Sequence, residues 1–260
     1  MDKLTEQNFI SKIHSKTDLT QYINAIFSDR KIGPIEFLPL ANHCLEHTKT
    51  NVAAFKAFRR LERLWVLLKF LLFSLKNTSG PIAECGVLRG FSASAMNILM
   101  GEIKKLENER LLDIWLIDSF EGLSEPVEKD WILIESKNKD NSYYGPSMQK
   151  GHFATPIEEV KKHFLQSPNV RFAKGWVPDV FINLPEEKWS LVHIDLDLYQ
   201  PIKDSLSYFY PRMSPGGVII NDDFGSPLFP GAGKAWEEFF KEKNEGYAIL
   251  DTGQAVFIKK

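Results

Sequence analysis

Four aspartates at the ends of two apolar runs are the residues of this chain best suited to chemistry. Asp195 and Asp197 belong to the segment HIDLDLY, while Asp222 and Asp223 form an adjacent pair within GGVIINDDFG. Carboxylates that pack together repel one another, so such a cluster needs a bound proton or a positive charge. Because an oxygen-only ligand set suits a hard ion such as Mg²⁺, we predict metal-assisted chemistry at these residues.

The segment SLVHIDLD alternates as a β-strand does, with His193, Asp195 and Asp197 on one side and apolar residues on the other. Ligands of open α/β sheets bind outside the carboxyl ends of the strands, where Asp195 and Asp197 would lie. His193 lies deeper, which favours a hydrogen-bonded core histidine over a ligand or a base. Asp222 and Asp223 alone would be ordinary solvated or capping residues, but beside Asp195 on a neighbouring strand they indicate a metal site.

A second candidate site follows an earlier predicted strand, in the segment AECGVLRGFSASA. Gly86 and Gly90 would let a ligand approach the backbone, and the next helix begins with free N–H groups. The loop lacks the dinucleotide fingerprint G-x-G-x-x-G, and an acid, Glu84, precedes its first glycine. A carboxylate suits a cationic sulfonium or amino group, which indicates S-adenosylmethionine instead of NAD. The alternative is a strand-end acid that caps the loop amides.

The next predicted strand ends in WLIDSFEGL and places Asp118 at the same edge of the sheet. There an acid can accept hydrogen bonds from both ribose hydroxyls of a nucleoside. The alternative is an aspartate that begins a turn, since Asp-Ser is common turn material. Ser92 from the glycine loop and Ser119 from this segment complete the predicted set of cofactor contacts.

The composition is that of an ordinary folded protein, with 43% apolar and 25% charged residues among 260. Lys and Arg (32) nearly balance Asp and Glu (34), so no overall positive field would attract nucleic acid or an anionic membrane. We therefore expect a small-molecule substrate. The two cysteines, Cys44 and Cys85, do not suggest a disulfide framework or a cysteine metal site, which is consistent with a reducing cytoplasm.

Neither membrane insertion nor export is expected from the apolar segments. The most apolar stretch, LERLWVLLKFLLFSL, is interrupted by Glu62, Arg63 and Lys69 and is shorter than the roughly 20 residues of a membrane span. The amino-terminal segment has no apolar run followed by a small-residue cleavage site. We expect the apolar stretch to form a core helix and the amino-terminal segment not to be a signal peptide.

The chain divides into a helical extension at residues 1–78 and an α/β domain at residues 79–260. A stripe of apolar residues ends the extension and predicts a helix packed on the main domain, with self-association as the alternative. The stripe recurs every three or four residues, at Val52, Phe55, Phe58, Leu61, Leu64, Trp65, Leu68, Leu71, Leu72 and Leu75.

From residue 79 onward, short β-rich runs alternate with helical stretches, which is typical of a parallel sheet built from βαβ units. The segment YAILDTGQAVFIKK predicts a terminal hairpin that turns at Thr252 and Gly253. Five strands and this hairpin give the Rossmann-like, seven-stranded α/β sheet of the class I S-adenosylmethionine methyltransferases. Strands are expected near 82–87, 113–118, 170–174, 190–196 and 217–222, and helices near 92–107, 156–166, 201–210 and 232–243.

Residues 124–155 interrupt this alternation with mixed polar and aromatic residues, among them Trp131, Tyr143 and Tyr144. Insertions of this kind often cover a substrate. Two interpretations remain open for the segment: a lid over the site, or a plain excursion on the surface.

From these motifs the chain resembles the macrocin O-methyltransferase family, the metal-dependent sugar O-methyltransferases of antibiotic biosynthesis. The resemblance covers roughly residues 80–245, through AECGVLRGFSA, LIDSFEGL, KGWVPDVF, HIDLDLYQP, YPRMSPGGVIINDDFG and AWEEFF. It implies cofactor contacts around Glu84, Gly86, Gly90 and Asp118. It further implies Mg²⁺ held by Asp195, Asp222 and Asp223, with Asp197 or the metal-bound Asp195 as the catalytic base.

The resemblance implies methyl transfer from S-adenosylmethionine to a hydroxyl of a sugar or glycoside acceptor that carries a vicinal diol. A catechol-type O-methyltransferase is one alternative, because a similar three-acid site could bind an aromatic diol. A protein that binds the cofactor without catalysis is the other. Acids at every expected position argue against the last, because an unused charge cluster costs stability.

Overall fold

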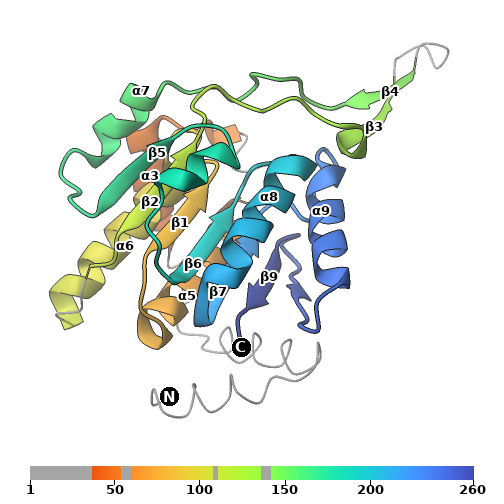
Figure 1. Cartoon of the computed structure of the whole chain (residues 1–260). Coiled ribbons are helices and arrows are strands. Elements are labelled where there is room, and N and C mark those ends of the chain that lie inside the picture. Colours follow the sequence, from red (N-terminus) through yellow and green to blue (C-terminus); the bar gives the residue numbers. More distant parts are fainter. Residues whose placement is uncertain (1–36, 54–59, 108–110, 136–141) are drawn as a thin grey trace.

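The computed structural model describes residues 37–53, 60–107, 111–135 and 142–260 of the chain. Its centre is a seven-stranded sheet in the order β5-β2-β1-β6-β7-β9-β8 (Figure 1). The first five strands in this order are parallel, and β9 runs antiparallel to both β7 and β8. The strands are β1 (Ile82–Cys85), β2 (Ile114–Asp118), β5 (Val170–Lys174), β6 (Trp189–Ile194), β7 (Met213–Asn221), β8 (Ala248–Ile249) and β9 (Ala255–Ile258).

This topology confirms the predicted class I S-adenosylmethionine methyltransferase sheet, including the hairpin that ends it. The hairpin turns where the sequence indicated, because Leu250 N–H donates to the Gln254 carbonyl at 2.9 Å across Thr252 and Gly253. All six residues of β6 and all four of β1 are buried, as expected for parallel strands covered on both faces. The central strands therefore form a rigid floor whose carboxyl ends carry the acids of interest.

Helices cover both faces of the sheet and enclose two cores. Side chains alternate along each strand, so Leu191 faces one core and its neighbour Val192 the other. The helices on the first face are α3 (Leu38–Thr48), α5 (Arg60–Asn77) and α6 (Phe91–Glu107), and those on the second are α8 (Tyr199–Phe209) and α9 (Pro230–Lys241). The predicted helix at 156–166 is a short α7 (Ile157–Lys161) that continues as a 3-10 turn, Lys162–Phe164.

Helix α5 contains most of the predicted apolar stripe and packs against β6 and β7. Leu64, Leu68 and Leu71 are buried in the same core as the sheet, whereas Val52 is 50% exposed and lies outside it. Phe55 and Phe58 of the predicted stripe lie outside the described residues, as do residues 1–36. The division at residue 78 stays a proposal. Among the described residues, no helix combines the length and the apolar character that a bilayer span requires.

The inserted segment forms a small antiparallel pair, β3 (Trp131–Ile134) with β4 (Tyr143–Pro146), which projects from the body of the molecule (Figure 1). Tyr143 and Tyr144 are 59% and 60% exposed. The base of the segment is anchored, because the Asp130 carboxylate accepts a hydrogen bond from Tyr199 N–H, at the start of α8, at 2.8 Å. The choice between a lid and a surface excursion stays open.

Candidate active site

The acids after β6 and β7 lie close together because backbone hydrogen bonds join the ends of β1, β6 and β7. Asp195 N–H donates to the Cys85 carbonyl at 2.8 Å, and Asp222 N–H donates to the Ile194 carbonyl at 2.9 Å. Strand β6 ends at Ile194, earlier than the predicted residue 196, so Asp195 and Asp197 lie on the loop that follows. Asp197 adopts a φ of +61°, which ends the alternation of the strand.

Two overlapping groups of side chains offer ligand atoms that lie within 4.8 Å of one another. One consists of His193, Asp195 and Asp222, and the other of Asp195, Asp197 and Asp223. Asp195 is common to both, but Asp222 and Asp223 fall in different groups, so among the described residues the predicted triad of Asp195, Asp222 and Asp223 is divided between the two. The second group is purely carboxylate, a donor set that fits a hard divalent cation such as Mg²⁺.

Two arginines of α5 supply positive charge to this acidic cluster. Arg63 Nη2 forms an ion pair with Asp222 Oδ2, also donates to the Asp222 backbone carbonyl, and lies 3.3 Å from Asp223 Oδ1. Arg60 Nη1 lies 3.7 Å from Asp195 Oδ2. The side chain of Arg63 is 12% exposed and that of Arg60 34%, so Arg63 forms the buried part of the contact. The helix predicted as scaffold therefore also enters the site.

The protonation states of the acids differ because their surroundings differ. Burial alone would raise the pKa of Asp222, but the attraction of Arg63 and His193 outweighs it and holds that pKa below the ordinary range. Burial and then the repulsion of Asp195 raise the pKa of Asp197 to about 8. The pKa of Asp223 is also raised well above its ordinary value, first by burial and then by the repulsion of Asp195 and Asp197. Thus Asp222 is the acid most firmly held as a carboxylate.

His193 connects the acidic cluster to the loop after β1. The strand register pairs Glu84 with His193, and Nδ1 of the imidazole lies 3.1 Å from Glu84 Oε1. Its Nε2 lies 3.3 Å from Asp222 Oδ1, which also accepts a hydrogen bond from Gln254 Nε2 at 2.6 Å. Burial lowers the pKa of His193, but Asp222 and Glu84 outweigh burial and raise it to about 10. The core histidine expected from sequence thus lies between two acids, and both of them favour its protonated form.

Glu84 lies at the candidate cofactor loop and is fully buried. Burial raises its pKa, although the His193 contact acts in the opposite direction. Its Oε2 atom has no hydrogen-bond partner among the described residues. A buried carboxylate oxygen of this kind calls for a donor or a positive charge, as the amino group or sulfonium of S-adenosylmethionine would provide.

The glycines of this loop are required by the backbone and by close packing. Gly86 and Gly90 adopt φ values of +89° and +80°. A Cβ atom built on Gly86 would lie 1.7 Å from the backbone oxygen of Asp195, so only glycine lets the cofactor loop contact the acidic loop. At Gly90, a Cβ would lie 3.1 Å from the Phe164 ring. The sequence indicated glycines that let a ligand approach the backbone, whereas the close contact between Gly86 and the Asp195 backbone is a finding of the structure.

Asp118 holds the shape of the cofactor loop. Its Oδ2 accepts hydrogen bonds from Val87 N–H at 2.7 Å and Leu88 N–H at 3.3 Å, and its Oδ1 accepts one from Phe120 N–H at 2.7 Å. The bond from Phe120 N–H is the turn-forming role that we expected as the alternative to a ribose contact. Oδ1 accepts one of these hydrogen bonds and can accept a second, so the ribose contact stays a proposal.

The two predicted serines occupy different environments. Ser92 lines a cavity of about 20 Å³ together with Arg60, Arg63, His193 and Asp195. Ser119 is engaged locally instead, since its hydroxyl donates to the Gly122 carbonyl at 3.0 Å and accepts from Glu121 N–H at 3.1 Å. Ser92 therefore lies on the side of the acids, and Ser119 shapes the turn after β2.

Arg60, Arg63 and Gln254 belong to the site but were not predicted from sequence. For the arginines a signal was present, because charged residues within an apolar helix need a partner when the helix is buried. Gln254 follows the turn of the terminal hairpin, where its type alone gives no signal. The hydrogen bond from Gln254 to Asp222 joins the hairpin to the acidic cluster.

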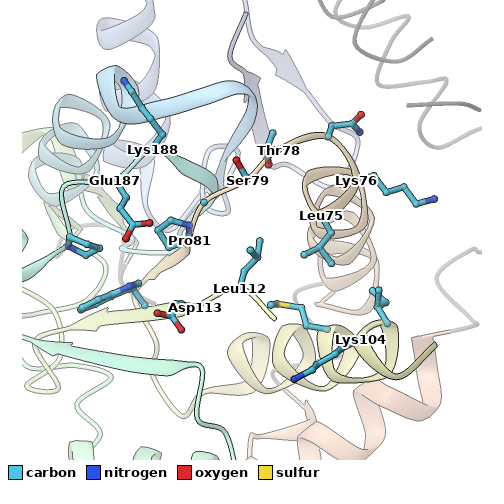
Figure 2. Close-up of a pocket in the computed structure, with 16 residues that line it drawn as sticks. Leu75, Lys76, Thr78, Ser79, Pro81, Lys104, Leu112, Asp113, Glu187 and Lys188 are labelled. Carbon is cyan, nitrogen blue, oxygen red and sulfur yellow. The ribbon is translucent and has the colours of Figure 1, made fainter. Parts of the chain in front are cut away.

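A larger cavity, of about 750 Å³, lies at the opposite edge of the sheet, beside the amino ends of β1 and β2. Leu75, Pro81 and Leu112 line it together with Asp113 and Glu187 (Figure 2). None of its lining residues belongs to the predicted site. Since ligands of open α/β sheets bind at the carboxyl ends of the strands, the acidic edge is the better candidate.

Strand order, glycine loop and acids together define a class I S-adenosylmethionine methyltransferase fold. A solved structure described as the calicheamicin methyltransferase CalS11 has the same fold, with a TM-score of 0.61 and 19% identity. The alignment covers 87% of this chain and 93% of CalS11.

The family follows from the sequence. Residues 56–258 match the profile of the macrocin O-methyltransferase (TylF) family, and the chain belongs to that family. The predicted resemblance is therefore confirmed, and the match also includes α5.

Two curated relatives come from Streptomyces. The 8-demethyl-8-(2,3-dimethoxy-alpha-L-rhamnosyl)-tetracenomycin-C 4'-O-methyltransferase of Streptomyces olivaceus is 30% identical over 170 residues, 64% of this chain and 60% of the relative. The demethyldecarbamoylnovobiocin O-methyltransferase of Streptomyces niveus is 31% identical over 157 residues, 57% of this chain and 54% of the relative. The matched part thus spans little more than half the length of these relatives.

Proposed function

We propose that this protein transfers a methyl group from S-adenosylmethionine to a hydroxyl of a sugar or glycoside, with the help of Mg²⁺. One observation carries the proposal: Glu84, at the end of β1 before the proposed cofactor loop, and Asp222 of the acidic cluster lie on either side of His193. A methyl donor and an acceptor hydroxyl must meet for transfer, and the short distance between the two proposed sites supports such a meeting. Membership of the macrocin O-methyltransferase family supports the same reaction.

The donor would lie against the loop between β1 and α6. S-adenosylmethionine supplies the methyl group as a sulfonium, whose positive charge Glu84 would attract. Asp118 keeps the loop in shape through three backbone N–H groups and would accept hydrogen bonds from the ribose. Gly86 and Gly90 would let the donor approach the backbone. Ser92 and Ser119 stay in the proposed set of contacts.

Asp195, Asp222 and Asp223 would hold the ion, since they combine oxygen ligands with positions at the ends of adjacent strands. When bound, Mg²⁺ supplies Lewis acidity that lowers the pKa of an acceptor hydroxyl and orients a vicinal diol. Asp195 or Asp197 would accept the proton of the hydroxyl. Both lie on the loop after β6, within the group that also contains Asp223.

A sugar acceptor is favoured because the Streptomyces olivaceus relative is named for a substrate that bears a rhamnosyl group. The purified protein should be incubated with S-adenosylmethionine, Mg²⁺ and either rhamnosides or catechols, and the products examined by mass spectrometry. A gain of one CH₂ on a rhamnoside is the expected result. Methylation of catechols alone would indicate that the acceptor is an aromatic diol and not a sugar. Methylation of neither class, in a protein that binds the donor, would favour the non-catalytic alternative.

A further inference from the structure

Arg63 is an unusual residue for the buried face of a helix. It lies in α5 beside Leu64 and Leu67, both of which are buried, and its own side chain is 12% exposed. Arginine is almost never buried without a partner, because removal of its charge from water is costly. The partners of Arg63 are the carboxylates of Asp222 and Asp223.

The guanidinium of Arg63 uses the same acids that are proposed to hold the divalent ion. Its Nη2 contacts an oxygen of Asp222, the backbone carbonyl of Asp222 and an oxygen of Asp223. One nitrogen thus occupies the space between two of the three proposed metal ligands.

The surroundings leave little room for both cations at once. The cavity lined by Arg60, Arg63, Asp195 and Asp222 has a volume of about 20 Å³. Roughly 10 to 15 Å³ is needed for a single water molecule. Bound Mg²⁺ usually keeps several waters in an octahedral arrangement. A hydrated ion at Asp222 and Asp223 would therefore compete with the guanidinium for the same carboxylate oxygens.

We infer that Arg63 is an internal counter-ion that competes with the divalent ion for Asp222 and Asp223. This inference rests on the proposed metal site. Without the ion, Arg63 neutralises the acids and keeps the edge of the sheet folded. When the ion binds, the Arg63 side chain leaves the acids while α5 itself stays packed on β6 and β7. The affinity of the protein for the ion is consequently weaker than that of the acids alone.

The rival interpretation is that Arg63 positions the acids and remains in contact with them when the ion is bound. The two interpretations predict opposite effects of removing the charge. Competition predicts tighter binding of the ion after the substitution Arg63→Gln, whereas positioning predicts weaker binding. Arg60→Gln is a matched control, because Arg60 lies one helical turn away, is 34% exposed and contacts Asp195 at 3.7 Å.

The test is calorimetric titration of the wild-type protein, Arg63→Gln and Arg60→Gln with MgCl₂ and with MnCl₂, without S-adenosylmethionine. We expect Arg63→Gln to bind the ions at least about tenfold more tightly than wild type, a typical size for coupling between two ligands. Arg60→Gln should change the affinity less. Equal or weaker binding by Arg63→Gln would overturn the inference while the metal site stands. Absence of binding in all three proteins would refute the metal site itself.

A second measurement uses the wild-type protein and does not depend on the variant being stable. Phenylglyoxal modifies accessible guanidinium groups, and peptide mass spectrometry identifies the arginine that reacts. Competition predicts that Arg63 reacts slowly in EDTA and several-fold faster in saturating Mg²⁺, because the ion releases it from Asp222 and Asp223. An unchanged or slower reaction at Arg63, with Mg²⁺ binding verified by calorimetry, would contradict the inference.

Discussion

His193 and Glu84 contact each other across two adjacent strands, with Nδ1 of the imidazole 3.1 Å from Oε1 of the carboxylate. Both side chains are buried, and the parallel register of β1 and β6 places them opposite each other. The other imidazole nitrogen faces Asp222 at 3.3 Å. The proposed donor site and the proposed metal site thus share one histidine, so that a change at either site affects the other.

Substitution of His193 by alanine should lower the free energy of unfolding by about 3 kcal/mol, because the buried Glu84 carboxylate loses its histidine partner and Asp222 loses one of its charged partners. Urea denaturation measures this change. His152→Ala serves as a control, because His152 is exposed and the change there should stay within about 0.5 kcal/mol. If His193→Ala were as stable as wild type, the contact between His193 and the two acids would not contribute to folding.

Gly86→Ala should weaken both the fold and the binding of S-adenosylmethionine. The added Cβ would lie 1.7 Å from the Asp195 backbone oxygen, and alanine is strained at a φ of +89°. Gly101→Ala is the matched control, because Gly101 lies within α6 and a Cβ there meets nothing within 4 Å. That control should stabilise the protein by up to about 1 kcal/mol. Thermal unfolding that shifts equally in both variants would contradict the packing argument.

Asp118→Ala should reduce the affinity for S-adenosylmethionine by about 10- to 100-fold, since it removes charge-assisted hydrogen bonds from the cofactor loop. Asp113→Ala is the control just before the other end of the same strand, where Asp113 pairs with the exposed Arg171, at 3.4 Å. Calorimetry with the donor measures both variants. Unchanged affinity in Asp118→Ala would show that neither the loop shape nor the ribose contact depends on this acid.

Replacing Asp197 by asparagine separates the two candidate bases. If Asp197 accepts the proton of the acceptor hydroxyl, kcat should fall by about 10²- to 10⁴-fold while Mg²⁺ and donor binding persist. Asp195→Asn should in addition weaken the binding of Mg²⁺, because Asp195 is also a proposed ligand. Wild-type turnover by Asp197→Asn would assign the base to Asp195. Single-turnover kinetics with calorimetry of each variant provides the measurement.

The fold could be predicted from the sequence because the patterns that indicate its strands and turns are local. Apolar runs indicated β1, β2 and β6, and the turn at Thr252 and Gly253 indicated the antiparallel end of the sheet. Strand ends were less accurate, since the apolar alternation of HIDLDLY continues past Ile194 after the strand has ended. There the backbone of Asp197 turns to a positive φ, which residue type alone did not indicate.

The residues of the site could be predicted from the sequence only where they lie at the ends of strands. Asp195 and Asp222 were predicted to converge because neighbouring parallel strands end at one edge. Arg63 was missed, because its partners lie 159 and 160 residues away in sequence and periodicity identifies only the buried face of a helix. The role of His193 depends on the register between β1 and β6, which the sequence does not state.

We propose that methyl transfer to a sugar hydroxyl needs a divalent ion held by Asp195, Asp222 and Asp223. The most direct test measures methylation of a rhamnoside after treatment with excess EDTA, and again after addition of Mg²⁺. We predict that EDTA abolishes transfer, that Mg²⁺ restores it in the wild-type protein, and that Asp222→Ala stays inactive although it still binds S-adenosylmethionine. Full methylation of the rhamnoside in excess EDTA would contradict the account.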